Sequence, residues 1–259
     1  MNRLFSSLVA VLAMTLSMKT LGQTGVCFDF TSTLDTQGTY RGSLKNGARL
    51  SQLEGIPILD LGEGNGYFDF GTEVGSWVQT FDDYTIAMDV FLPLTADLSG
   101  NGNFVWCFAK SSSQGYLFAN AKDTRMAITE TTYWDEQGVN VGKPLAKGQW
   151  VNLLYRQQGD KGQLFLDGVL AKEGTITLKP KTLEGLTQNY LGRSCYSGDA
   201  YLKGAQYHHV RLYDYALPTD SINKLVADCE VLKKIIEDRN LEYLLQTFTL
   251  GDVSALTYD

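Results

Sequence analysis

The chain has 259 residues, a formal net charge of −7 at pH 7, four cysteines and two histidines. The acidic balance argues against nucleic acid and anionic membrane surfaces as partners, because both need a basic footprint on the protein. The length fits a single large all-β domain, since β-sandwiches of this size commonly form one domain.

The N-terminal residues 1–22 predict a secretory signal peptide. Arg3 precedes an apolar run over residues 4–18, and Lys19 ends that run. The run is too short to span a bilayer comfortably, and no second apolar run follows, so we expect no membrane insertion. Cleavage is expected around residues 22–24. The mature chain is therefore expected to be exported to the periplasm, the cell surface or the extracellular medium.

The even number of cysteines allows two disulfides in an exported chain, with three ways to pair them. Cys107 with Cys195 is the preferred pairing, because both fall on expected core strands. Buried free thiols that act as small apolar residues are an equal alternative. A zinc site is not expected, since there is no C-x-x-C arrangement and the two histidines, His208 and His209, are adjacent.

Short runs rich in β-branched and aromatic residues alternate with turn residues from Cys27 to Tyr213, which predicts many short strands. Residues 84–91 are the clearest strand. One face carries Tyr84, Ile86, Met88 and Val90, and the other carries Thr85, Ala87 and Asp89. The alternation predicts one buried face and one wetter face.

Residues 150–173 predict a three-stranded meander. Residues 150–156 and 163–166 form its first two strands. Asp167 and Gly168 follow, and this pair supplies the positive φ angles of a tight hairpin. A third strand then begins at Val169.

The hydrophobic period changes after residue 217. Apolar side chains recur at spacings of three and four, at Ile222, Leu225, Val226, Cys229, Leu232 and Ile236. This stripe predicts an amphipathic helix, and a second helical stretch at residues 241–245 follows Asn240. We therefore expect a helical linker over residues 218–247, which packs on its own sandwich or on a further domain.

Four ordered motifs resemble one family. They are residues 64–71 (GNGYFDFG), residues 84–90 (YTIAMDV), the pair 150–153 (WVNL) and 164–168 (LFLDG), and the closing segments 189–194, 200–204 and 210–217. In this order they resemble the strands of laminin-G-like, concanavalin A-like lectin/glucanase domains. The resemblance implies an all-β fold: a two-sheet antiparallel jelly-roll β-sandwich over residues 23–217, with a C-terminal helical extension.

The resemblance implies a range of functions, because this fold hosts lectins, glycan-binding accessory modules, adhesion modules and some glycosidases. Such domains often stand at the N-terminus of exported bacterial glycoside hydrolases, so a downstream catalytic domain is expected. Residues 248–259 resemble the start of an immunoglobulin-like domain, here truncated. The family often binds Ca²⁺ through an acidic residue before its last motif, where this chain has His209. Imidazole is a poor ligand for Ca²⁺, so a Ca²⁺ cofactor stays open.

Catalysis by this domain is not expected. Glycosidases need two carboxylates that flank one bond, and related glucanases place them on alternate residues of a strand. The nearest approximation is Glu130 with Asp135 and Glu136, whose spacing straddles an expected turn.

Two aromatic and polar clusters are candidate glycan-binding sites, because sugars offer apolar C–H patches together with hydroxyls. The first comprises Tyr133, Trp134 and Asp135, and the second comprises Tyr196, Asp199 and Tyr201. The alternative is that these aromatics cover a sheet face, as we expect of Trp77, Trp106 and Trp150.

The sequence thus favours a non-catalytic, exported carbohydrate-binding accessory module whose partner is a polysaccharide or other glycan. The first alternative is a structural spacer or protein-interaction module beside a glycoside hydrolase domain. It would be favoured if Tyr133 and Trp134 were buried. The second alternative, a glycosidase, needs two carboxylates that converge in a groove.

Overall fold

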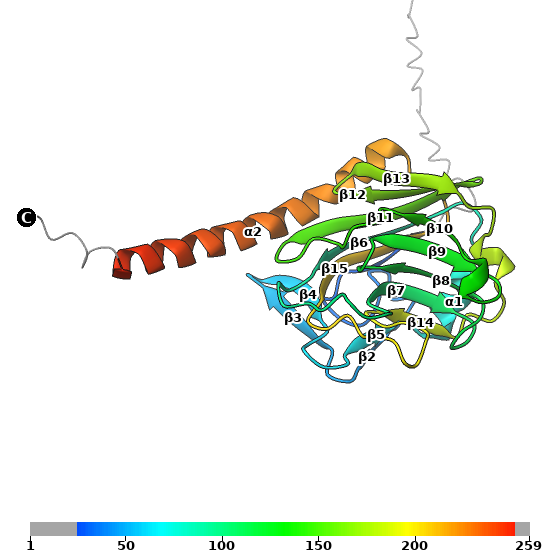
Figure 1. The fold of residues 1–259 in the computed structure, drawn as a ribbon, viewed down its shortest axis with the longest axis horizontal. Coiled ribbons are helices and arrows are strands. Elements are labelled where there is room, and N and C mark those ends of the chain that lie inside the picture. Colours follow the sequence, from blue (N-terminus) through cyan, green and yellow to red (C-terminus); the bar gives the residue numbers. More distant parts are fainter. Residues whose placement is uncertain (1–24, 252–259) are drawn as a thin grey trace, which may run out of the picture.

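A computed structural model describes residues 25–251, with side chains described up to residue 243. Two antiparallel β-sheets stack face to face, and a long C-terminal helix lies across one of them (Figure 1). This arrangement confirms the predicted all-β sandwich with a helical extension. The signal peptide expected at residues 1–22 lies outside the described residues, as does most of the immunoglobulin-like start expected at residues 248–259.

The first sheet has eight strands. Their order is β13 (Val169–Thr175), β12 (Lys161–Leu166), β11 (Trp150–Gln158), β6 (Tyr84–Phe91), β15 (Gln206–Tyr213), β4 (Ile56–Asp60) and β3 (Arg49–Leu53), and β1 (Gly25–Phe28) also pairs with β15. The predicted meander forms β11, β12 and β13. Asp167 and Gly168, with φ angles of 51° and 76°, make the tight turn between the last two strands, as predicted.

The second sheet has seven strands. Their order is β10 (Gln137–Asn140), β9 (Arg125–Thr129), β8 (Tyr116–Asn120), β7 (Phe104–Ala109), β14 (Gln188–Leu191), β5 (Tyr67–Asp69) and β2 (Ser43–Lys45). Helix α1 (Gly71–Val78) and two short 3₁₀ helices, η1 (Tyr133–Asp135) and η2 (Pro180–Thr182), lie in the connections.

The main core fills the space between the two inner faces. Alternate side chains of β6, namely Tyr84, Ile86, Met88 and Val90, point into it, as the sequence pattern predicts. Aromatic rings from several segments meet there in edge-to-face contacts, such as the one between Phe28 and Phe68, whose centroids are 5.7 Å apart. Trp106 and Trp150 are buried, whereas Trp77 is half-buried against the core and stacks on Tyr40.

The predicted wetter face of β6 is also buried. Thr85, Ala87 and Asp89 are all fully inaccessible to solvent. The prediction was wrong because helix α2 (Thr219–Gly251) covers this outer face of the eight-stranded sheet. Its apolar stripe packs there through residues such as Ile222 and Leu232.

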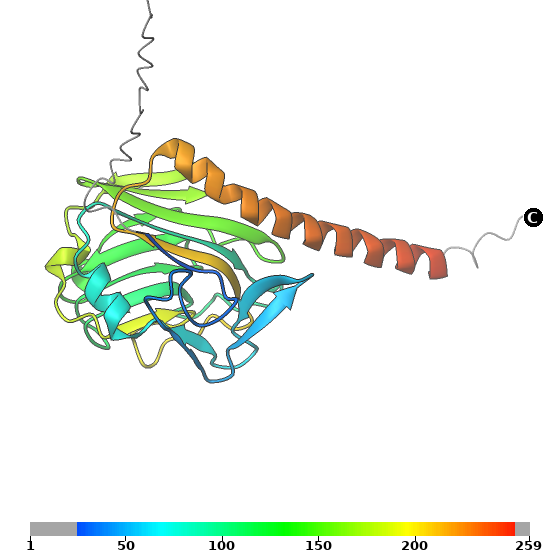
Figure 2. The same ribbon diagram turned by 180° about the vertical axis from the view of Figure 1, so that it is seen from behind.

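Helix α2 runs without a break past Asn240, so the two predicted helical stretches form one helix. Its C-terminal half extends beyond the sandwich, as the view from behind also shows (Figures 1 and 2). It includes residues 248–251, which the sequence assigned to a following domain. No helix formed by the described residues is long and apolar enough to cross a membrane.

Candidate functional site

A groove lies on the outer face of the seven-stranded sheet, the face that α2 does not cover. Strand alternation decides which side chains reach it. On β8, Leu117 and Ala119 point into the core, whereas Tyr116 and Phe118 point outward and line the groove. The groove has a volume of about 700 Å³, which is within the usual range for a small-ligand site.

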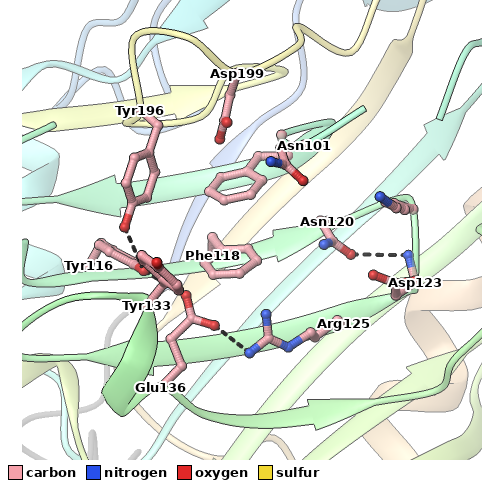
Figure 3. A pocket seen from close by; sticks show the side chains of 13 residues that line it. Asn101, Tyr116, Phe118, Asn120, Asp123, Arg125, Tyr133, Glu136, Tyr196 and Asp199 are labelled. Carbon is pink, nitrogen blue, oxygen red and sulfur yellow. Dashed lines mark hydrogen bonds and ion pairs between the residues drawn. The ribbon is translucent and has the colours of Figure 1, made fainter. Parts of the chain in front are cut away.

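Two phenylalanines from neighbouring strands form the floor of the groove. The rings of Phe104 on β7 and Phe118 on β8 stack in parallel, with centroids 4.0 Å apart and an interplanar angle of 2° (Figure 3). The guanidinium of Arg125, on β9, lies over Phe118 at 5.6 Å from the ring centroid. Both phenylalanine rings are almost fully covered, so the floor supports the groove rather than offering a free aromatic face.

A hydrogen-bonded network forms one wall. The hydroxyl of Tyr116 donates to Oε1 of Glu136 at 2.6 Å, and Arg125 forms an ion pair with Oε2 of the same carboxylate (Figure 3). The hydroxyl of Tyr196 lies 3.1 Å from that of Tyr116. Burial, followed by the hydrogen bond to Glu136, raises the pKa of Tyr116, so this hydroxyl keeps its proton at neutral pH.

The facing wall is a loop that runs from Ser194 to Tyr201. The hydroxyl of Ser194 donates to Asp199 at 2.6 Å, which orients that carboxylate beside the groove. The backbone of Ala200 pairs with the segment at Gly102 in an isolated bridge. Gly102 has a φ of 93°, and a Cβ there would lie 2.5 Å from the carbonyl oxygen of Ala200. Only glycine therefore permits this close approach of the two backbones.

The structure brings together parts of both predicted clusters. Tyr133 from η1, and Tyr196 and Asp199 from the loop, all line the groove. The side chain of Tyr133 is 54% exposed, and that of Trp134 is 79% exposed. The ring of Trp134 lies 4.4 Å from that of Tyr133 but does not line the groove.

Besides Trp134, two further predicted residues do not line the groove. Asp135 is exposed, and one of its oxygens accepts a hydrogen bond from the Thr131 hydroxyl at 2.6 Å. Tyr201 belongs to a separate cluster around Arg193, on the other side of the loop. Neither side chain lines the groove.

Sequence reasoning missed most of the groove. Tyr116, Phe118, Arg125 and Phe104 carry its floor and wall, and the sequence singled out none of them. The signal was the alternation of residues 116–120, where aromatic and amide side chains take every second position. In that pattern both faces of the strand carry apolar residues, and the sequence alone does not say which face points into the core and which lines the groove.

The predicted disulfide pair lies directly behind the groove. Cys107 and Cys195 are buried in one cluster with Phe104 and Tyr116, and all four cysteines are free thiols in this structure. Burial, and then a hydrogen bond to Cys195, raises the pKa of the Cys107 thiol. The two thiols are therefore neighbours, and their oxidation to a disulfide stays a prediction.

A group of metal-ligating side chains lies on the opposite side of the molecule, beneath α2. Asp89, His208 and His209 offer atoms within 4.8 Å of one another. Two imidazoles and one carboxylate do not supply the six to eight oxygens that Ca²⁺ takes. The Arg211 guanidinium also lies 3.8 Å from the Asp89 carboxylate, and its positive charge opposes a second cation there. This group therefore does not fit Ca²⁺.

The fold is similar to several solved binding domains. A structure of domain 4 of AbnA, a GH43 extracellular arabinanase from Geobacillus stearothermophilus, in complex with arabinotriose, matches with a TM-score of 0.62 and 13% identity. The match covers 78% of this chain and 96% of that one.

Botulinum neurotoxin type C, whose cell entry is described as dependent on two ganglioside molecules, matches with a TM-score of 0.59 and 11% identity, over 80% of this chain and 51% of that one. The binding domain of botulinum neurotoxin DC in complex with SialylT matches with a TM-score of 0.57 and 11% identity, over 80% and 51%. At these identities the likeness shows the fold alone.

A search of curated proteins finds no match to the chain. The family model described as "Laminin_G_3: Concanavalin A-like lectin/glucanases superfamily" matches residues 62–223, which is more than half of the chain and includes the strands that form the groove. The motifs, the two-sheet architecture and this match agree, and the chain belongs to the concanavalin A-like lectin/glucanase superfamily.

Proposed function

We propose that the protein is an exported, non-catalytic carbohydrate-binding accessory module that binds its glycan in the groove on the seven-stranded sheet. The observation that carries the proposal is the exposed ring of Tyr133 at a groove rich in polar groups. A sugar ring presents C–H patches that pack on an aromatic face, and hydroxyls that exchange hydrogen bonds with amides and carboxylates. Tyr133, Asn120 and Asp199 offer both kinds of contact at one groove.

The comparisons support this reading by fold. An arabinanase domain in complex with arabinotriose and the toxin binding domains share the sandwich, and their descriptions name a saccharide or a ganglioside. A domain that accompanies a glycan-degrading enzyme also matches the expectation of an exported accessory module beside a catalytic domain.

The contacts of the Glu136 carboxylate support glycan binding, rather than glycan hydrolysis, as the function of the groove. Its two carboxylate oxygens are occupied by the Tyr116 hydroxyl and by the Arg125 guanidinium. A glycosidase needs one carboxylic acid that gives up a proton and a second carboxylate on the other side of the bond. A carboxylate held by two donors is a structural acceptor, which supports binding over an acid role for Glu136; the groove also carries the carboxylates of Asp123 and Asp199.

Burial of the first aromatic cluster would have favoured the spacer alternative. Tyr133 and Trp134 are instead exposed, Trp134 more than any other large apolar residue among those described. The exposed ring of Tyr133 at the groove favours ligand binding, because a ligand that covers it removes apolar surface from water.

The test is a glycan-array screen of the chain from Gln23 onward, followed by titration of the best glycan by calorimetry. We expect Tyr133→Ala to weaken binding about tenfold, or about 1.4 kcal/mol, because it removes the exposed ring. Leu94→Ala is the matched control, since Leu94 is 77% exposed and lies outside the groove. The screen is run with Ca²⁺ and with a chelator, which decides the open question of the metal.

A blank array from a folded sample would contradict glycan binding and favour the spacer. If Tyr133→Ala does not change the glycan affinity, glycan binding stands as the function but the groove is not the binding site.

A further inference from the structure

A second cluster on the same outer face has features that the groove does not explain. The guanidinium of Arg193 lies against three tyrosine rings. Its central carbon is 4.6 Å from the ring centroid of Tyr67, 4.7 Å from that of Tyr190 and 5.7 Å from that of Tyr201. We call these four residues the Arg193 cluster. Tyr190 is opposite Cys107 in the sheet register, so the cluster stands on the face that carries the groove.

The hydrogen-bonding capacity of Arg193 is unused. Three other arginines, two partly buried and one buried, have acceptors: Arg125 pairs with Glu136, Arg156 donates to Gln163, and the buried Arg211 pairs with Asp228. Arg193, also half-buried, has no ion pair or hydrogen bond within residues 25–243. Tyrosine rings that stack on a guanidinium cover its flat faces and leave its in-plane N–H donors free. The rings therefore fix the direction of the Arg193 N–H donors, and no acceptor within residues 25–243 binds them.

A second cation lies next to the cluster. Lys45 on β2 is directly opposite Tyr67 in the antiparallel register, and side chains opposite each other stand on the same face of a sheet. Its ammonium group also has no ion-pair partner in the described part of the chain. The nearby carboxylate of Asp69 accepts the backbone N–H of Gly71 at 2.9 Å. A protein with a net charge of −7 thus presents Arg193 and Lys45, which have no ion-pair partner among the described residues, at one aromatic spot beside the carboxylate of Asp69.

We propose that the Arg193 cluster is an oxyanion subsite that binds the carboxylate or sulfate group of an acidic saccharide. The planar guanidinium fork matches both anions, and the three tyrosine rings hold it in place. The choice of a saccharide rests on the proposed function. The loop after Arg193 places Tyr196 and Asp199 at the groove and Tyr201 at the cluster, so one glycan chain that crosses this loop reaches both sites.

The experiment follows the side-chain Nε–Hε signal of Arg193 by ¹⁵N NMR, assigned with Arg193→Gln. The probes are trigalacturonate for a carboxylate, glucose 6-sulfate for a sulfate ester, inorganic sulfate for the bare anion, and maltotriose as the neutral saccharide. We expect the signal to shift with at least one acidic saccharide and not with maltotriose. Arg193→Gln is expected to weaken binding of that saccharide about tenfold, and Arg193→Lys to restore part of it.

The matched control is Lys224→Gln, which removes one positive charge from an exposed position on α2, over the other sheet. Lys224→Gln is expected to leave the affinity unchanged. Because it changes the net charge as much as Arg193→Gln does, the comparison separates loss of the Arg193 contact from the effect of net charge. A shift with inorganic sulfate but with neither acidic saccharide would overturn the saccharide assignment.

The two proposals fail in different ways. If no acidic saccharide shifts the Arg193 signal, or if Arg193→Gln binds it as tightly as the unmodified chain, the subsite is wrong, whatever the groove binds. If Arg193 responds to an acidic saccharide while Tyr133→Ala leaves all glycan binding intact, the groove is wrong and the subsite stands.

Discussion

The outer faces of the two sheets differ in whether helix α2 lies over them. Helix α2 lies over the outer face of the eight-stranded sheet (Figure 1), whereas it does not cover the outer face of the seven-stranded sheet, which carries the groove seen in Figure 3. Both faces carry aromatic and charged side chains. The helix therefore decides which face is part of the core and which face meets a ligand.

The covered face pairs most of its charged groups internally, although Oδ2 of Asp89, Oδ1 of Asn152 and Nε1 of Trp150 have no hydrogen-bond partner among the described residues. Asn152 donates to the buried Asp89 carboxylate at 2.7 Å, and Arg211 lies 3.8 Å from its other oxygen. Helix α2 completes the network with Asp228, which pairs with Arg211. Charges that are buried in this way need partners, because desolvation disfavours them. The face is thus a closed structural interface.

The open face leaves polar groups available. The amide of Asn120 and the carboxylate of Asp199 are at the groove, and the guanidinium of Arg193 nearby has no ion pair or hydrogen bond with any described residue. Phe104 and Phe118 stack below without much exposure, so they stiffen the floor instead of presenting a large apolar patch. The comparison teaches that the same sandwich provides one face for stability and one for recognition.

The largest expected effect comes from disturbing the covered face. Leu232 is fully buried between α2 and the sheet, in a cluster with Trp150 and Cys229. Leu232→Ala should lower the free energy of unfolding by about 2–5 kcal/mol, because it leaves a cavity in this cluster. Urea denaturation followed by tryptophan fluorescence measures the change.

The matched control is the neighbouring Val231→Ala, since Val231 is 54% exposed and should change stability by no more than about 0.5 kcal/mol. Glycan affinity, measured well below the unfolding transition, should stay the same in both variants. A loss of affinity in Leu232→Ala would show that the two faces are coupled and would break the comparison.

A smaller effect is expected from the wall of the groove. Glu136→Gln keeps an oxygen for the Tyr116 hydroxyl but removes the charge that pairs with Arg125. We expect a loss of about 1–2 kcal/mol in the free energy of unfolding, because Arg125 is left partly buried without its partner. Glycan affinity should also fall, since Arg125 is no longer held over Phe118.

Glu184→Gln provides the comparison for Glu136→Gln. The side chain of Glu184 is 85% exposed and only reaches Lys110 at 3.9 Å, so its removal should have almost no effect. Equal stability losses in the two variants would contradict a structural role for the carboxylate of Glu136.

The fold was predictable where local chemistry decides it, and the site was not. Asp167 and Gly168 specify a tight turn by themselves, and the alternation in residues 84–90 specifies a strand. The burial of Asp89 depends on a helix more than 120 residues later in the chain. The groove likewise depends on rings from separate strands, and Tyr201 was separated from Tyr196 because the loop between them turns away.

The smallest predicted effect is a pH dependence of stability that arises beneath α2. Burial raises the pKa of Asp89 to about 7, against hydrogen bonding from Asn152 and the charge of Arg211, with Asp228 and Cys229 also nearby. A raised pKa means that the folded state holds a proton that the unfolded state releases. Asp89 therefore contributes stability below about pH 4, and this contribution is lost as the pH rises to about 7.

His209 acts in the opposite direction. Burial, the charges of Arg211 and His208, and the weaker opposing effect of Asp228 and Asp29 lower its pKa to about 4. Its contribution is present above pH 6.5 and is lost as the pH falls to about 4, so the two groups offset each other in the unmodified chain. Asp89→Asn removes the contribution of Asp89 to the pH dependence and leaves that of His209. The free energy of unfolding of Asp89→Asn, relative to the unmodified chain, should decrease on the order of 1 kcal/mol from pH 7 to pH 6. Urea denaturation at both pH values measures this difference, and a value that is the same at both would mean that Asp89 has an ordinary pKa and that α2 does not seal the face it covers.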